Sequence, residues 1–377
     1  MKINYLFDVD LAEINPSIVH VLKMCQAFAE NGQDITLYCT GDGQTSVEDI
    51  FRRYGIKTPF PVVMVPPSEF LVRHGHRLAS WYTSWKRSRL DLGGGVLYAR
   101  STLSLFFLRR RAPYVFEAHL EPDALNRRFE RAILCHPNCK GLVVISQALK
   151  RRYLELFPFF PEEKIHVLHD AADVVEGPAP RKATLRGETA GQNIGYVGSL
   201  FPGKCMETLL PLAKRCPQHR FHVVGGTEYW VDYWKQAARE QEITNVEFYG
   251  FVDNSRLGEY YQAFDLCILP FSGNIYIGKS KRVDIGKWTS PLKLFETMAY
   301  GKPMVVSRLA TIEEVMLPGE DCLMARPDDI DDWVKTLQTL CQDPALQTRL
   351  AQAAREKLAR EYTWRQRAQR AAEIFEN

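Results

Sequence analysis

Two lysine-containing turns hold the residues of this sequence that are best suited to bind an anion. The first, Gly198–Lys204, joins the apolar run Ile194–Val197 to a helical pattern over Met206–Arg215. Its glycines let the backbone approach a ligand closely, and Lys204 adds a mobile positive charge at the start of the helix. Turns between strands and helices often contain Gly and Lys, so an ordinary turn remains an alternative. The functional hypothesis is a phosphate-binding loop.

The second turn is Ser290–Lys293, at the start of a helix expected over Pro291–Tyr300. Ser290 is expected to be the N-cap, with Pro291 at the first helical position. A helix start offers free N–H groups and the positive end of the helix dipole, so this turn can also hold an anion. Glu296 lies one turn further on and could face the same place. An ordinary capped helix is the alternative.

Short apolar runs alternate with helical patterns, which is typical of α/β proteins with parallel sheets. In the first half, strands are expected at residues 3–7, 35–39, 62–65, 96–99, 114–117, 141–145 and 165–168, and helices at 18–31 and 147–156. In the second half, strands are expected at 193–198, 220–224, 246–250, 266–270, 304–306 and 322–325, and helices at 206–215, 231–241, 291–300 and 344–376. The last helix is expected to break near Thr363.

A chain of 377 residues is long enough for two domains. The polar segment 173–192 contains prolines and glycines, so it is expected to be a linker. We therefore expect a first domain over 1–172 and a second over 193–361, both Rossmann-like and doubly wound, facing each other across a cleft. Ligands of such sheets bind at the carboxyl ends of the strands. Residues 362–377 are expected to pack back on the first domain.

The composition is that of a soluble globular protein, with 46% hydrophobic and 25% charged residues. No apolar run approaches the roughly 20 residues that span a bilayer. A net charge of +3 is too mild to indicate nucleic acid as a partner. Nine scattered cysteines favour a reducing cytoplasm, and Cys135 and Cys139 lack a second ligand pair for zinc. No metal is expected.

The sequence resembles the retaining glycosyltransferases of family 4, which have the two-domain GT-B fold. In the second half the resemblance rests on GYVGSLFPGKCMETLLPLAKRCPQHRFHVVGG, VEFYGFV, SPLKLFETMAYGKPMVVSRLATIEEV and YTWRQRA. In the first half it rests on INPSIVHVLKMCQAFAENG, YVFEAHLEP and VVISQALKRRY. It implies transfer of a sugar from a nucleotide diphosphate sugar (a UDP- or GDP-sugar) with retained anomeric configuration. No cofactor or metal is implied.

The resemblance also implies roles for individual residues. Lys204 would neutralise the leaving diphosphate, Glu296 would hydrogen-bond the donor ribose, and His119 would lie near the reacting sugar. Glu117, two residues before His119, is expected to point to the opposite face of its strand. Further donor contacts are implied for Gly198, Ser199, Gly250, Phe251, Val252, Ser290, Pro291, Leu292 and Lys293.

The sequence departs from the family pattern at the donor site. The family has a pair of glutamates eight residues apart. Glu296 matches the second of the pair, and Trp288 stands at the position of the first. Ser199 stands where the family has an arginine. The turn after the first strand is also not rich in glycine. These departures predict either altered donor contacts or lost activity. A cation from the connection before Ser290 could replace the arginine, and the candidates are Lys279, Lys281, Arg282 and Lys287.

The acceptor is indicated only by Phe70–Leu90, which contains five Lys or Arg residues, two His, three aromatic residues near helical spacing and no acid. A basic amphipathic helix with tryptophans suits an anionic membrane surface. Packing of its aromatic face on the first domain is the alternative. The membrane hypothesis predicts a cytoplasmic protein, peripheral on the inner face of the plasma membrane, with a glycan or lipid-linked acceptor.

The expected function is therefore a glycosyltransferase of cell-envelope polysaccharide or lipopolysaccharide synthesis. Two alternatives remain. One is a catalytically inactive GT-B subunit that binds a nucleotide sugar or a partner enzyme. The other is a GT-B sugar-nucleotide epimerase or phosphorylase, which the SPLKLFE and GK motifs match less well than a transferase. An ATPase or a dinucleotide-binding protein is not indicated, because the sequence contains neither a P-loop nor a GxGxxG motif.

Overall fold

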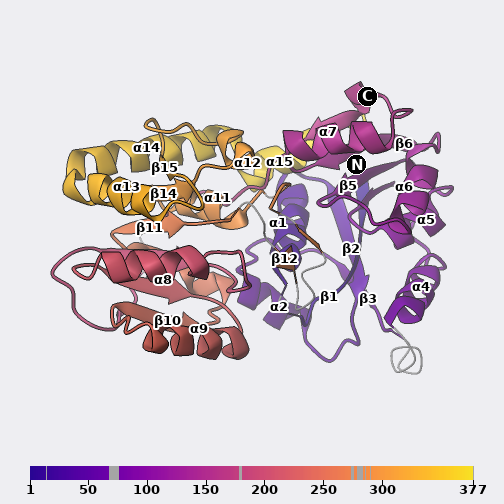
Figure 1. The fold of residues 1–377 in the computed structure, drawn as a ribbon. Helices are drawn as coiled ribbons and strands as arrows, with labels where there is room; N and C mark the ends of the chain where they lie inside the picture. Colours follow the sequence, from indigo (N-terminus) through magenta and orange to yellow (C-terminus); the bar gives the residue numbers. More distant parts are fainter. Residues whose placement is uncertain are drawn as a thin grey trace. The chain divides into compact units, whose positions relative to one another are not determined.

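The computed structural model describes residues 1–13, 15–67, 76–177, 181–272, 276–277, 283–284, 286–288 and 290–376. They form two compact units (Figure 1). The first unit combines Met1–Asp170 with Trp364–Asn377, and the second is Ala171–Thr363. No helix among these residues is long and apolar enough to cross a membrane.

The first unit contains a seven-stranded parallel sheet with the order β3-β2-β1-β4-β5-β6-β7. Its strands are β1 (Lys2–Asp10), β2 (Asp34–Thr40), β3 (Val62–Val65), β4 (Val96–Ala99), β5 (Tyr114–Ala118), β6 (Cys139–Val144) and β7 (Ile165–Val167). The strand order changes direction between β1 and β4. In doubly wound sheets this is the place where ligands bind, outside the carboxyl ends of the strands.

Helices connect these strands: α1 (Pro16–Glu30), α2 (Val47–Tyr54), α4 (His76–Arg87), α5 (Thr102–Leu108), α6 (Asn126–Leu134), α7 (Gln147–Leu156) and the short η1 (Glu162–Lys164). The last helix of the chain, α15 (Trp364–Glu373), packs against α1 (Figure 1). The Trp364 ring lies edge-on to the His20 ring at 5.1 Å, and Asn31 Nδ2 donates to the carbonyl of Arg365 at 2.9 Å.

The second unit contains a six-stranded parallel sheet with the order β10-β9-β8-β11-β14-β15. Its strands are β8 (Asn193–Val197), β9 (Arg220–Val224), β10 (Val246–Gly250), β11 (Leu266–Leu269), β14 (Met304–Ser307) and β15 (Leu323–Ala325). Its order changes direction between β8 and β11. A separate antiparallel pair is formed by β12 (Tyr276–Ile277) and β13 (Val283–Asp284).

The helices of the second unit are α8 (Met206–Arg215), α9 (Glu228–Glu240), η2 (Asn254–Arg256), α10 (Leu257–Ala263), α11 (Leu292–Ala299), α12 (Ala310–Glu313), α13 (Ile330–Gln342) and α14 (Pro344–Glu361). The predicted break near Thr363 is confirmed, because α14 ends at Glu361 and α15 begins at Trp364.

The second sheet is buried on both faces, because alternate residues of each strand enter different clusters of the core. Ile194 and Tyr196 of β8 belong to one cluster, whereas Val197 belongs to the other. Strands buried on both sides are near-continuous apolar runs, which is why they stand out in the sequence.

The segment expected to be a linker belongs to the second unit. Ala172 forms a bridge with Thr363, and the backbone N–H of Ala183 donates to the carbonyl of Glu259 at 2.9 Å. The backbone N–H of Arg186 donates to Tyr249 Oη at 2.8 Å. These contacts tie residues on both sides of 178–180 to the body of the unit.

Candidate active site

Lys204 of the second unit lies where the strand order of its sheet reverses. The Lys204 turn follows β8, and Phe271 follows β11, the neighbouring strand. Lys204 Nζ lies 5.9 Å from the centre of the Phe271 ring, and the N–H of Ser272 donates to the carbonyl of Gly203 at 3.2 Å. These contacts bring the two strand ends together at the position where doubly wound sheets bind ligands.

Lys204 has no carboxylate partner within the described part of the chain. Burial lowers the pKa of its ammonium group, although the Cys205 thiol acts in the opposite direction. The nearby Glu207 carboxylate instead accepts from the backbone N–H of Gly203 at 2.8 Å. An anion in the turn would therefore be the natural counterion of Lys204.

Glycines hold the ends of β8, β9 and β10 together. A Cβ on Gly198 would lie 2.5 Å from Tyr196 Oη, and one on Gly225 would lie 2.2 Å from the carbonyl oxygen of Gly198. The N–H of Gly225 also donates to the carbonyl of Gly250 at 2.7 Å. The predicted residues Gly198 and Gly250 are thus joined through Gly225, which the sequence analysis did not assign to the site.

Helix α11 starts differently from the prediction. Pro291 (φ −79°, ψ 117°) is the N-cap, Leu292 is the first helical residue, and no side chain caps the first turn. The prediction that Ser290 caps the helix was wrong. Pro291 itself has an extended ψ of 117°, so the helix begins after it, and Ser290 is one position too early to be the N-cap. Proline has no side-chain acceptor, so the N-cap residue itself does not cap the first-turn N–H groups.

The carboxyl end of α11 confirms the prediction that the helix ends near Tyr300, since Tyr300 is its C-cap. Gly301 adopts a left-handed conformation (φ +58°), and the N–H of Lys302 donates to the carbonyl of Thr297 at 3.2 Å. This is the pattern of a helix terminated by glycine. Strand β14 then begins at Met304.

Glu296 is held by an ion pair within the same helix. Lys293 Nζ lies 2.9 Å from Glu296 Oε2 and 3.1 Å from Oε1. Tyr261 Oη donates to Glu296 Oε2 at the longer distance of 3.4 Å. Both charged side chains of the pair keep about a fifth of their surface exposed, 23% for Lys293 and 17% for Glu296. The carboxylate is therefore oriented and still accessible to a ligand.

The remaining predicted donor residues lie at loop positions of the second unit. Phe251 is exposed directly after β10, and Val252 packs against the core. The carbonyl of Ser199 accepts from Tyr196 Oη at 3.0 Å. Trp288 is half-buried and Lys287 is exposed. The other candidate cations, Lys279, Lys281 and Arg282, lie outside the described residues.

His119 of the first unit follows β5 and contacts Glu117. His119 Nε2 lies 2.6 Å from Glu117 Oε1. The prediction that Glu117 points to the opposite face was wrong, because residues two apart along a strand share a face. Burial lowers the pKa of His119 to about 3, and Arg100 acts in the same direction. The imidazole is therefore neutral at pH 7, with its proton on Nε2 toward the carboxylate and a lone pair on Nδ1.

Glu117 is the centre of a buried network. Its Oε1 also lies 2.9 Å from His20 Nε2 and 2.8 Å from Arg367 Nη2, and its Oε2 accepts from Tyr98 Oη at 2.6 Å. Burial alone would raise the pKa of Glu117, but Arg367 and His20 outweigh it and hold the pKa well below its usual range. The group therefore remains a carboxylate.

Sequence reasoning missed four residues of this network: His20, Tyr98, Asp170 and Arg367. His20 Nδ1 lies 2.8 Å from Asp170 Oδ1, and Arg367 Nε donates to the carbonyl of His169 at 2.9 Å. His20 lies in INPSIVHVLKMCQAFAENG and Arg367 in YTWRQRA, two segments that support the family resemblance. That position was the only signal in the sequence that could have pointed to these two residues. Nothing in the sequence indicated that they meet Glu117.

His20, His119 and Asp170 could together hold a metal ion, since one potential ligand atom of each lies within 4.8 Å of the others. In the structure, however, both His20 nitrogens face carboxylates and His119 Nε2 faces Glu117. A metal would have to replace these contacts. The arrangement therefore serves to fix the orientation of His119.

Two family models match the chain. The model "Glycosyltransferase Family 4" matches residues 18–176, and the model "Glycosyl transferase-like" matches residues 206–373. A curated relative, the glycogen synthase of Mycobacterium tuberculosis, is 24% identical over 240 residues, which are 62% of this chain and 53% of the relative. The chain thus spans about half the length of that relative.

Solved structures match over the full length. HepE from Anabaena, in complex with UDP and glucose, has a TM-score of 0.73 and 16% identity, covering 100% of this chain and 99% of that one. The lipopolysaccharide outer core galactosyltransferase WaaB has a TM-score of 0.66 and 14% identity, covering 99% of both chains. The two doubly wound sheets are those of the GT-B fold, and the chain belongs to the GT-B glycosyltransferases.

Proposed function

We propose that this protein is a retaining glycosyltransferase that moves a sugar from a UDP- or GDP-sugar to a glycan or lipid-linked acceptor. The observation behind this proposal is Lys204, an ammonium group without a carboxylate partner at the reversal point of the second sheet. A diphosphate is the ligand whose charge and size match this lysine and the first-turn N–H groups of α11.

The chemistry requires a stabilised leaving group more than a strong base. Departure of the diphosphate builds negative charge, which Lys204 and preorganised N–H groups of α11 would stabilise. Glu296 would accept hydrogen bonds from the ribose hydroxyls. The acceptor hydroxyl would attack from the face that the nucleotide leaves, passing its proton to a phosphate oxygen. Neutral His119 would hydrogen-bond the transferred sugar through Nδ1.

The comparisons support UDP as the nucleotide to test first, because HepE binds UDP and glucose. WaaB is named as a lipopolysaccharide galactosyltransferase, which supports a role in cell-envelope glycan synthesis for the present chain. All nine cysteines are free, which is consistent with our proposal of a cytoplasmic protein.

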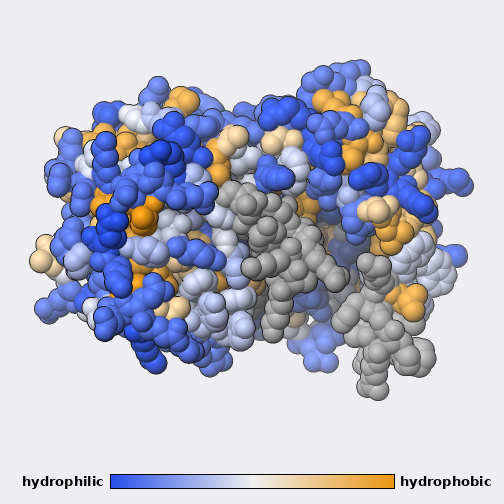
Figure 2. All heavy atoms as spheres, viewed as in Figure 1, coloured by the Kyte–Doolittle hydropathy of each residue, from blue (hydrophilic) through white to orange (hydrophobic). Residues whose placement is uncertain are grey.

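Helix α4 supports contact with an anionic membrane. Its side chains Leu78, Trp81 and Trp85 are 59%, 38% and 42% exposed. Figure 2 shows hydrophobic residues interspersed on the surface around α4, α5 and α6. Lys86 and Arg89 lie at and beyond the end of α4, and Arg89 stacks over the Trp85 ring at 5.0 Å. Residues 68–75, the start of the basic segment, lie outside the described part of the chain.

Membrane contact is tested by co-sedimentation with phosphatidylcholine vesicles that contain 0% or roughly 30% phosphatidylglycerol. Binding is expected to require the anionic lipid and to weaken in high salt, because surface attraction between charges is screened. The variant Trp81→Ala/Trp85→Ala should bind less, whereas exposed Tyr229→Ala on the second unit should not change binding. Equal binding to both vesicles would exclude an electrostatic membrane site.

The transfer reaction is tested with purified protein and a panel of UDP- and GDP-sugars. The expected result is donor hydrolysis or transfer with one of them, with an α-linked product from an α-linked donor by NMR. Lys204→Ala should remove this activity and Lys214→Ala, on the exposed face of α8, should not. A β-linked product would overturn the retaining mechanism.

A second candidate function is a catalytically inactive subunit that binds a nucleotide sugar. It is favoured by Trp288 and Ser199 at positions where the family has Glu and Arg. This candidate predicts UDP binding without turnover for every donor of the panel, and the same panel therefore separates the two.

A further inference from the structure

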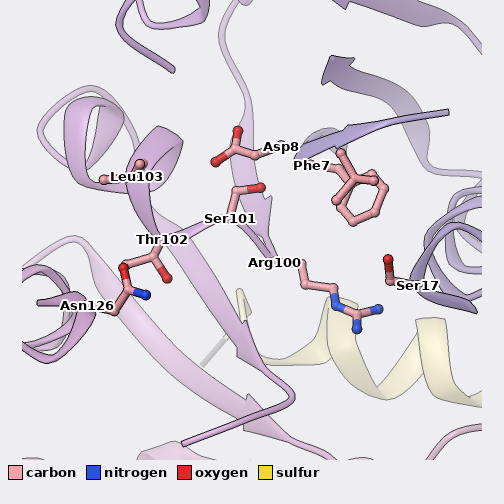
Figure 3. Close-up of a pocket in the computed structure, with 9 residues that line it drawn as sticks. Phe7, Asp8, Ser17, Arg100, Ser101, Thr102, Leu103 and Asn126 are labelled. Atoms are coloured by element: carbon pink, nitrogen blue, oxygen red, sulfur yellow. The ribbon is translucent and has the colours of Figure 1, made fainter. Parts of the chain in front are cut away.

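A polar cavity of about 340 Å³ lies at the reversal point of the first sheet (Figure 3). It is bounded by the ends of β1 and β4 and by the starts of α1, α5 and α6. Its lining residues are Phe7, Asp8, Val9, Ser17, Arg100, Ser101, Thr102, Leu103 and Asn126. Ligand pockets in proteins span roughly 300–1,000 Å³, so this cavity suits a small group such as one sugar residue.

Arg100 is the one cation among the residues that line this cavity, and no carboxylate forms an ion pair with it in the described structure. Arg100 Nη1 is buried and has no hydrogen-bond partner in the described structure. Figure 3 shows its guanidinium group extending toward Ser17, across the cavity from Asn126. A buried guanidinium N–H without an acceptor is costly, so an acceptor from a ligand would stabilise it.

The carboxylates of Glu117 and Asp8, which lie near Arg100, accept hydrogen bonds from other side chains. Glu117 accepts from His119, Tyr98 and Arg367; its charge favours the ionised form of Arg100, but it makes no hydrogen bond with Arg100 in the described structure. Asp8 lines the cavity, but it pairs with the fully buried Arg87, and Ser104 Oγ donates to it at 2.5 Å. His119 carries no charge at pH 7. The guanidinium of Arg100 therefore has no hydrogen-bonded anionic partner among the described residues.

We propose that this cavity binds an anionic group, a carboxylate or a phosphate, of the acceptor substrate, with Arg100 as its charge partner. Ser17, Thr102 and Asn126 would hydrogen-bond the hydroxyls of the sugar that bears the anion. A guanidinium matches both anions in two-point geometry. The assignment of the anion to the acceptor rests on the proposed glycosyl transfer, whereas anion binding itself does not.

The test is isothermal titration of the full-length Lys204→Ala variant, so that the proposed diphosphate site of the second unit does not contribute. The probes are methyl glucuronide, glucose 6-phosphate, methyl glucoside and inorganic phosphate. The two charged sugars are expected to bind at least about tenfold more tightly than the neutral one, since a charge-assisted hydrogen bond contributes roughly 1.5–3 kcal/mol. Equal binding of charged and neutral sugars would overturn the proposal.

Adding Arg100→Ala should abolish the preference for charged sugars, and Arg100→Lys should keep part of it. Arg110 is exposed and lies outside the cavity, so Arg110→Ala should keep all of it. Thermal unfolding checks that each variant is folded. If Arg100→Ala does not fold, Ser17→Ala and Asn126→Ala provide the test, with about fivefold weaker binding of both charged sugars expected. Unchanged binding in both variants would contradict the proposed site.

The probes also separate the possible sources of the anion. Binding of inorganic phosphate without either charged sugar would identify a free-anion site and overturn the acceptor assignment. Charged-sugar binding in a protein that fails to bind UDP or turn over any donor would retain the Arg100 site and overturn the proposed transfer reaction. The two conclusions therefore fail independently.

Discussion

Arg367 Nη2 donates to Glu117 Oε1 at 2.8 Å, across 250 positions of sequence. Helix α15 thereby places a guanidinium group on a carboxylate that is fully buried at the end of β5. The same guanidinium group reaches the carbonyls of Leu168 and His169. The positive charge of Arg367 keeps Glu117 ionised, and the Glu117 carboxylate orients His119. This charge comes from α15, the part of the first unit that is most distant in sequence from Glu117.

Removing Arg367 should strongly destabilise the first unit. Arg367→Met leaves Glu117 as a buried charge without its guanidinium partner, for which a loss of roughly 3–5 kcal/mol in the free energy of unfolding is expected. Urea unfolding followed by far-UV circular dichroism measures it. Arg370→Met, on the exposed side of the same helix, is the control, and equal midpoints for the two variants would contradict this account.

The first unit should lose stability in acid. The pKa values of Glu117 and Asp170 lie below their ordinary values, and that of His119 is lowered from 6.5 to about 3. The unfolded chain therefore binds more protons at these groups in this range, so their contribution to stability is full above pH 6.5 and is lost as the pH falls toward 3. Unfolding midpoints measured between pH 3 and 8 test this. His119→Asn should flatten the part between pH 6.5 and 4.

Glu130 should have the opposite pH dependence. It is buried, accepts from Tyr153 Oη at 2.8 Å, and its burial raises its pKa to about 8. A raised pKa stabilises the fold fully below the ordinary value near 4.5, and this contribution is lost as the pH rises toward 8. At about 1.4 kcal/mol per pKa unit, the loss is of the order of 4 kcal/mol.

The variant Glu130→Gln tests this directly, because it stays neutral. It should be more stable than the parent protein at pH 8.5 and similar to it at pH 5, in urea unfolding at both values. The exposed Glu163→Gln should show no such difference. If the parent protein and Glu130→Gln showed the same change in stability between pH 5 and pH 8.5, Glu130 would not be protonated in the fold.

Lys204→Ala should lower kcat by about 100-fold or more, the size found for loss of one group that stabilises a developing anion. Lys204→Arg should recover part of the rate, since charge is retained with different geometry. Steady-state kinetics with the active donor measures both. A larger KM at unchanged kcat would instead indicate that Lys204 binds the ground state and the transition state equally.

The strands were predictable because parallel strands buried on both faces are short, continuous apolar runs. Val62–Val65, Arg220–Val224 and Val246–Gly250 have the predicted limits. Three helices of the first unit, α2, α5 and α6, were not predicted. Helix α5, TLSLFFL, is only seven residues long and almost entirely apolar, so it shows no helical periodicity. Helix α6, NRRFERAIL, starts after Leu125, whose side chain cannot cap it, and the Asp123 carboxylate accepts from the N–H of Asn126 at 2.8 Å instead.

The candidate site was predictable only where its residues are close in sequence. The Lys204 turn and α11 each include local patterns of glycine, proline and charge. His20, Glu117, Asp170 and Arg367 meet through the sheet and two helices, and single-sequence patterns do not encode such distant contacts. The missing hydrogen-bond partner of Arg100 Nη1 could not be predicted for the same reason, because it depends on contacts between residues that are distant in sequence.

The position of α15 also has a consequence for synthesis on the ribosome. The second unit is a continuous segment, Ala171–Thr363, whereas the first unit needs Trp364 and the residues after it. Folding units form as their chain emerges. The first sheet must therefore wait, with the Glu117 carboxylate lacking Arg367, until the second unit has been made.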